Sequence, residues 1–113
     1  MTAVSSPWHR PAAPRPRISM LGLSGVVELL TLTPRSPERA FDISEGGLGV
    51  LSQDPIPAGT LVLAVLALPG ERRTHDVIVR VAWSEGPAMG LEFLMPDDAL
   101  VESISRLRLD PDQ

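Results

Sequence analysis

The sequence predicts an all-β domain, a six-stranded antiparallel β-barrel with one C-terminal helix. Short apolar runs recur along residues 26–95, and in several of them apolar and polar residues alternate. Turn segments rich in proline and glycine separate these runs. One stretch with helical periodicity follows the last run. With 113 residues, of which 43% are hydrophobic and 21% are charged, the chain can build one domain with a modest core.

The six strands follow from the apolar runs and from the turns between them. Residues 34–37, 54–59, 69–72 and 85–87 carry the turn signals. The run 60–68 is apolar on both of its alternating faces, which predicts the core on one side and a helix or a partner on the other. We expect the strands at residues 26–33, 39–44, 47–52, 60–68, 76–84 and 89–95.

Alternation along a strand also predicts which side chains face the core. In 39–44, Phe41 and Ile43 should point inward, which leaves Asp42 and Ser44 side by side on the surface. Gly46 and Gly47 follow, and they allow either a turn with positive φ or close approach of a ligand to the backbone. In the last two strands, one face should carry Val77, Val79, Val81 and Trp83, and then Met89, Leu91, Phe93 and Met95.

A helix is predicted to begin at residues 96–98. Asp97 is a good N-cap, and Asp98 suits the positive end of the helix dipole. Arg106 and Arg108 fall in the last turn, where cations are favoured. The apolar stripe should cover the second face of strand 60–68 or an open end of the barrel, and it consists of Leu100, Val101, Ile104 and Leu107.

Composition narrows the function. Residues 1–17 hold four prolines, which predicts an extended or mobile arm ahead of a domain at 18–109. All ten basic residues are arginine; residues 1–39 carry a net charge of +3 and the remainder −7. A net acidic chain is a poor binder of nucleic acid polymers, although the N-terminal arginines could hold a small dianion. Without an evident targeting segment or membrane span, a cytoplasmic protein is expected.

Neither a metal site nor an enzyme is expected. The chain has no cysteine, and His9 and His75 lie far apart without ligand spacing. Ser44 has no histidine near it in sequence, and Asp97 and Asp98 are better explained as helix-start residues. The glycine-rich segment 46–49 leads into a strand rather than a helix, which argues against a phosphate-binding loop of the P-loop kind.

One short motif and the segments after it resemble a known family. Asp42-x-Ser44-x-x-Gly47 resembles the [D/N]-x-S-x-x-G signature of PilZ domains, bacterial receptors for cyclic di-GMP. The strands 61–68, 77–83 and 89–93 resemble the later barrel strands of that family, so that the resemblance covers about residues 26–107. It implies a PilZ-like barrel, signalling rather than catalysis, cyclic di-GMP as the ligand, and a protein partner that the sequence does not name.

The resemblance also implies a ligand set. Asp42, Ser44, Gly46 and Gly47 would form the floor of a guanine pocket, and N-terminal arginines would close over it. PilZ proteins carry an R-x-x-x-R motif upstream, whereas the arginines in the corresponding arm are unevenly spaced: Arg10, Arg15 and Arg17. Arg35 and Arg39 do have that spacing, but they are better explained as a solvated hairpin, with Arg39 on the face opposite Asp42.

This departure leaves two functions open. The first is a cyclic di-GMP receptor or adaptor in bacterial second-messenger signalling. The alternative is a degenerate PilZ-like domain that binds no nucleotide and acts as an adaptor through protein contacts. Its contact surface would be either strand 61–68 or the stripe of the helix.

Overall fold

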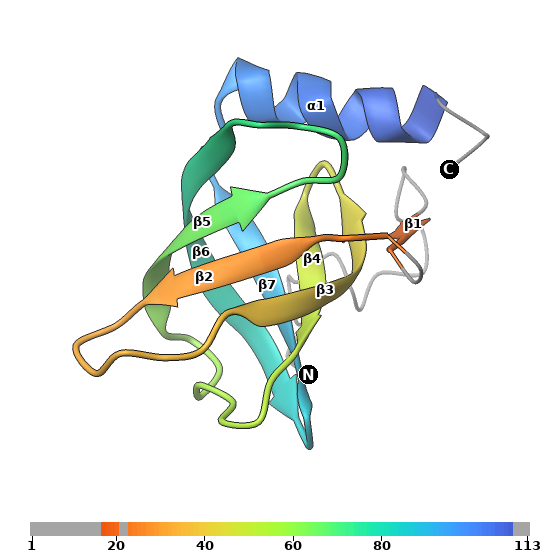
Figure 1. Ribbon diagram of the computed structural model, residues 1–113. Coiled ribbons are helices and arrows are strands. Elements are labelled where there is room, and N and C mark those ends of the chain that lie inside the picture. Colours follow the sequence, from red (N-terminus) through yellow and green to blue (C-terminus); the bar gives the residue numbers. More distant parts are fainter. Residues whose placement is uncertain (1–16, 21–22, 110–113) are drawn as a thin grey trace, which may run out of the picture.

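The computed structural model describes residues 17–20 and 23–109, and the arm expected at 1–17 therefore lies almost wholly outside the described residues. The described part is a closed antiparallel β-barrel of six strands, with one extra strand and a C-terminal helix, as the sequence predicted (Figure 1). The elements are β1 (Ile18–Ser19), β2 (Val26–Leu30), β3 (Glu38–Ser44), β4 (Gly47–Leu51), β5 (Leu61–Ala67), β6 (Thr74–Glu85), β7 (Ala88–Leu94) and α1 (Asp98–Leu109).

The barrel closes because β3 pairs on both of its edges. The sheet order is β1-β3-β2-β5-β6-β7-β4, and an additional pairing of β3 with β4 completes the ring. The start of β3 pairs with β2, while its end pairs with the two-residue strand β1 along the same edge. Closure thus joins the two edges of the sheet, and β1 pairs with part of the β3 edge beyond the two positions where β2 pairs.

The core fills the barrel, and it includes most of the residues that alternation placed on one face in β6 and β7. Ile43, Leu48, Leu66, Val79 and Leu91 are among its fully buried side chains. Each expected inward position of β7 up to Phe93 is buried as well. Met95, which was expected to continue this face, is instead 95% exposed, with φ at 54°, because the strand has ended at Leu94.

Two β-bulges change the predicted facing of the aromatic residues. The register of β3 against β4 shifts between Ala40 and Asp42, and the register of β6 against β7 shifts between Val81 and Trp83. A bulge adds one residue to one strand, so alternation resumes out of phase. The expectation that Phe41 and Trp83 face the core is therefore wrong, and both are half-buried outside it.

The helix α1 lies across one end of the barrel, which is one of the two positions expected for it (Figure 1). Leu100 and Ile104 are buried and Leu107 packs against the core, while the backbone N–H of Leu100 donates to Asp97 Oδ1 over 2.9 Å. Asp97 is thus the N-cap, as predicted. The outer face of β5 stays uncovered, with Leu61 and Leu63 61% and 39% exposed.

Ion pairs hold the helix to the barrel turns. Arg106 Nη1 lies 3.6 Å from Glu71 Oε2, and His75 Nε2 lies 2.8 Å from Glu71 Oε1. Burial, the largest single influence, would raise the pKa of Glu71. Hydrogen bonds from Ser103 and His75, together with the charges of His75 and Arg106, outweigh burial and lower that pKa. The carboxylate form of Glu71 is therefore favoured in the folded state.

Candidate functional site

The candidate site is built at the end of the β3–β4 hairpin where the extra strand joins it. Ile18 pairs with Ile43, and Ser19 pairs with Asp42. The backbone N–H of Met20 then donates to the carbonyl of Phe41 over 2.8 Å, and the Met20 side chain is fully buried. These contacts fix the start of β1 beside the outward residues of β3, and they bring Arg17 to Asp42.

The Arg17 guanidinium lies among three of the residues that the sequence motif singles out. Its Nη2 donates to Asp42 Oδ1 over 2.8 Å and lies 3.4 Å from the carbonyl oxygen of Gly47. Its Nη1 donates to Ser44 Oγ over 3.4 Å. The Arg17 and Asp42 side chains are 24% and 22% exposed, so this ion pair is only partly screened by solvent.

The acceptors are held in place by the backbone of the hairpin. Asp42 Oδ1 also accepts the N–H of Gly49 over 3.0 Å, and Ser44 Oγ accepts the N–H of Gly46 over 3.3 Å. Ser44 is only 6% exposed, so the expectation that it lies on the surface is wrong. The bulge after Ala40 and the guanidinium of Arg17 together explain why this hydroxyl is buried although it points away from the core of apolar side chains.

The glycines act by allowing close approach rather than by positive φ. Among the described residues, the glycines with positive φ are Gly59, Gly70 and Gly86, so Gly46 and Gly47 take ordinary backbone conformations. Gly49 was not among the residues singled out in the sequence. A Cβ there would lie 2.4 Å from Cζ of Phe41 and 2.9 Å from Asp42 Oδ1.

A second glycine and a second aromatic side chain continue this surface. Gly49 pairs with Gly90 of β7, and Gly90 pairs with Trp83 of β6. A Cβ at Gly90 would lie 2.1 Å from Nε1 of Trp83. Phe41 thus lies over Gly49, close to Asp42, and Trp83 lies over Gly90, the pairing partner of Gly49. This arrangement could not be found from the sequence, because the two bulges that turn these side chains outward depend on strand pairing.

The hairpin turn is also connected to α1. Glu45, which lies between Ser44 and Gly46, has a side chain that is 15% exposed. Its Oε1 accepts a hydrogen bond from Arg108 Nη2 over 2.7 Å, and its Oε2 lies 3.3 Å from the hydroxyl of Ser105. The C-terminal part of the helix is therefore anchored one residue away from the candidate site.

Beyond Arg17, the expected ligand set contains two other arginines. Arg10 and Arg15 lie outside the described residues. Arg39 is exposed, but the bulge places it on the same outward side as Asp42 rather than opposite it, which corrects the expected facing.

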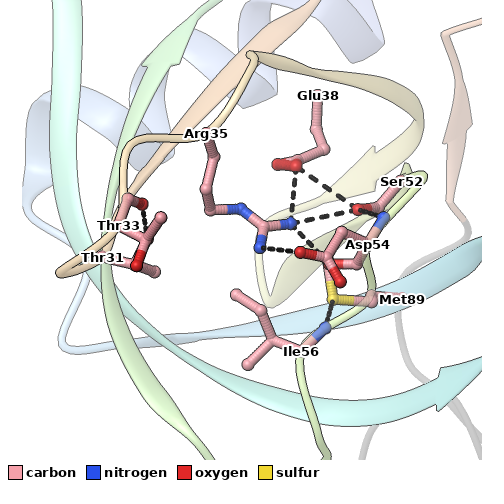
Figure 2. A network of polar contacts seen from close by, with 8 residues as sticks. All are labelled: Thr31, Thr33, Arg35, Glu38, Ser52, Asp54, Ile56 and Met89. Carbon is pink, nitrogen blue, oxygen red and sulfur yellow. Dashed lines mark hydrogen bonds and ion pairs between the residues drawn. The ribbon is translucent and has the colours of Figure 1, made fainter.

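The interpretation of Arg35 as part of a solvated hairpin is also wrong. Its side chain is 12% exposed, and its Nη2 donates to Glu38 Oε2 over 2.8 Å, to the carbonyl of Asp54 over 2.7 Å and to Ser52 Oγ over 3.1 Å (Figure 2). A hollow of about 680 Å³ lies beside it, lined by residues 34–39, residues 51–54 and Pro87. This network stands at the opposite ends of β3 and β4 from Ser44 and Gly47, and it is separate from the candidate site.

Two further properties bear on the kind of site. Within residues 17–20 and 23–109, no three histidine, aspartate or glutamate side chains are grouped so that they could hold a metal ion. In the same part of the chain, no helix is long and apolar enough to cross a membrane.

The fold and the site define a class of protein: a small closed β-barrel, capped by a helix, that presents an arginine-bridged polar site on one hairpin. The PilZ domain family matches residues 11–109, and the chain belongs to that family. PilZ domains are non-catalytic receptor domains that typically bind cyclic di-GMP.

A structural comparison agrees with the fold. The crystal structure of an uncharacterized Legionella protein is similar with a TM-score of 0.62 and 17% sequence identity; the match covers 88% of this chain and all of that one. At this identity the likeness concerns the fold alone. No curated protein matches the chain.

Proposed function

We propose that this PilZ domain is a cytoplasmic receptor for cyclic di-GMP, with Arg17, Asp42, Ser44 and Gly47 at the centre of its site. The observation that carries the proposal is the position of Arg17, which β1 holds against three residues of the family motif. Catalysis is not proposed.

Arginine suits the phosphates of this ligand. Its planar guanidinium makes paired hydrogen bonds to phosphate oxygens and can also stack on a base. In the structure, Arg17 Nη2 is occupied by Asp42 Oδ1, and a phosphate would compete for that donor. Arg10 and Arg15 precede it in the chain and would supply further positive charge as the arm closes over the ligand.

The hairpin surface suits a guanine base. The carboxylate of Asp42 can accept hydrogen bonds from the N–H groups of guanine, while the base offers O6 and N7 as acceptors to arginine. Phe41 lies over Gly49, which pairs with Asp42, and Trp83 lies over Gly90, which pairs with Gly49. Stacking of a base on an aromatic side chain contributes about 1–3 kcal/mol.

The alternative function is an adaptor that binds no nucleotide, for which two protein-contact surfaces were expected. One of the two is not available. The helix stripe is used inside the domain, since Leu100 and Ile104 are buried. Only the uncovered outer face of β5 still favours protein contacts. Titration calorimetry distinguishes the two functions, because an adaptor that binds no nucleotide would give no heat with cyclic di-GMP.

Isothermal titration calorimetry with cyclic di-GMP tests the proposal. Loss of a charge-assisted hydrogen bond costs about 1.5–3 kcal/mol, so Arg17→Ala should weaken binding by about tenfold or more. Asp42→Ala should also weaken binding, because it removes the acceptor for the guanine N–H groups, but by less, because it frees Arg17 Nη2 for the phosphate. Arg39→Ala is the matched control, because Arg39 is exposed, lies on the same strand and makes no ion pair with the described residues.

Three outcomes would contradict the proposal in different ways. No heat from the unchanged protein at micromolar nucleotide removes the receptor function. Equal affinity for cyclic di-AMP removes the guanine pocket. Binding that survives Arg15→Ala combined with Arg17→Ala removes the arginine assignment. Amide exchange over residues 8–20 should fall when the ligand binds, since ordering of the arm accompanies closure.

A further inference from the structure

The outer face of the barrel carries an unbroken apolar row across four strands. Leu30 of β2 pairs with Leu63 of β5, which pairs with Ile78 of β6, which pairs with Leu94 of β7. Leu30, Leu63 and Ile78 are 51%, 39% and 51% exposed. Such a contiguous apolar patch on a small domain marks an interaction surface.

Charges flank this row in an ordered way along β6. Its outward residues are Asp76, Ile78 and Arg80, while Val77, Val79 and Val81 face the core. Arg80 donates through Nε and Nη2 to Glu92 of β7, yet its side chain is still 42% exposed. Asp76 is exposed and makes no ion pair with the described residues. An acid, an apolar residue and a base therefore stand at equal spacing, with Ile78 in the middle.

This pattern is complementary to itself under one two-fold rotation. If the two-fold axis runs along the apolar row, each strand lies opposite the same strand of the partner, in the antiparallel direction. A residue before Ile78 in one protomer then faces the equivalent residue after Ile78 in the partner. Asp76 of one protomer then faces Arg80 of its partner, twice per dimer, and Ile78 packs on Ile78. A two-fold axis parallel to the strands would instead place Asp76 against Asp76 and Arg80 against Arg80, which repel.

We propose that this face binds a second copy of the chain, with the two β6 strands antiparallel and face to face. Isologous two-fold contacts of this kind are the commonest in homo-oligomers, and face-to-face sheets pack about 10 Å apart. On β5, Leu61 and Val65 flank Leu63, so this strand extends the apolar contact. Because barrel walls are convex, β5 and β6 make most of the contact, and a dissociation constant of about 1–100 µM is expected for so small an interface.

Sedimentation equilibrium of the full chain without nucleotide, from low micromolar to several hundred micromolar protein, tests the dimer. The unchanged protein should dimerise with concentration. Asp76→Arg and Arg80→Asp should each weaken the dimer by about tenfold or more, because each places like charges opposite one another. Mixed in equal amounts, the two variants should dimerise again, since every contact between them pairs unlike charges. A third variant, Ile78→Lys, should weaken the dimer without changing the rim.

Glu85→Arg is the matched control for Asp76→Arg: it makes the same change of charge at an exposed position on β6 outside the proposed contact. Three results would overturn the proposal: an unchanged protein that stays monomeric throughout, single variants that dimerise as well as the control, or a mixture that stays monomeric. If Arg80→Asp fails to fold because Glu92 loses its partner, Asp76→Arg and Ile78→Lys decide alone. Nucleotide binding plays no part in this experiment, so its result is independent of the proposed function.

Discussion

Removing Glu38 should expose how much the buried ion pair at the far end of the hairpin contributes to folding. Glu38 is 7% exposed and Arg35 12%, and their atoms lie 2.8 Å apart. Breaking a buried pair by removing one partner costs about 3–5 kcal/mol, because the remaining charge is left without compensation. Arg35 would keep the carbonyl of Asp54 and the hydroxyl of Ser52, so we expect about 3 kcal/mol, at the lower end, for Glu38→Ala.

If the uncompensated charge of Arg35 causes this loss of stability, replacing both partners should cost much less. An apolar pair of similar volume is often neutral, so Arg35→Met combined with Glu38→Leu should stay within about 1 kcal/mol of the unchanged protein. Urea denaturation followed by tryptophan fluorescence measures both, as a shift of the midpoint at constant slope. If Glu38→Ala shifts the free energy of unfolding by less than about 0.5 kcal/mol, or if the double variant is as unstable as the single one, the buried-pair account fails.

Three further predictions concern other parts of the chain. Gly49→Ala should destabilise the domain by about 1–3 kcal/mol in thermal melting, since its Cβ would meet Phe41, whereas a shift below about 0.5 kcal/mol would contradict the close contact. Folding lowers the pKa of Glu71, so the Glu71 carboxylate stabilises the folded protein. This stabilisation is complete above the pKa of Glu71 in the unfolded chain, and it is lost as the pH falls through its pKa in the folded protein. Glu71→Gln should thus be less stable than the unchanged protein at pH 7, and denaturation at pH 3 should show the gap narrowing; a constant gap would be the contrary result. Ala13→Arg would place a second arginine four residues before Arg17, which is the spacing of the R-x-x-x-R motif of PilZ proteins. Titration with cyclic di-GMP should then show tighter binding than for the unchanged protein.

The strands and the helix could be predicted from the sequence because alternation and capping are local. Ile43 and Leu91 face the core as expected, and Asp97 caps the helix as expected. The side of the sheet on which Phe41 and Trp83 lie could not be predicted. A bulge depends on the register with the neighbouring strand and cannot be recognised from the residues of one strand alone.

The same limit explains what was missed around the arginines. β1 has two residues, too few for any periodicity, so the position of Arg17 beside Asp42 follows only from tertiary pairing. Arg35 lies outside the strands, and its burial depends on Ser52 and Asp54, which are 17 and 19 residues away. The spacing of four residues between Arg35 and Arg39 therefore did not show by itself where either side chain lies.

The site combines acceptors held by the hairpin backbone with a cation that lies next to a short extra strand, and this affects how a binding measurement is interpreted. Backbone N–H groups of Gly49 and Gly46 hold Asp42 and Ser44, whereas Arg17 stands at the start of a two-residue strand. When a phosphate binds Arg17 Nη2 in place of Asp42, one charge-assisted hydrogen bond forms and another is broken. The measured affinity therefore reports the difference in free energy between the two hydrogen bonds. Every 1.4 kcal/mol by which the Arg17–Asp42 pair stabilises the free protein lowers the affinity about tenfold. Asp42→Asn, which weakens that pair but keeps a hydrogen-bonding side chain, separates the competition for Arg17 from the recognition of the base.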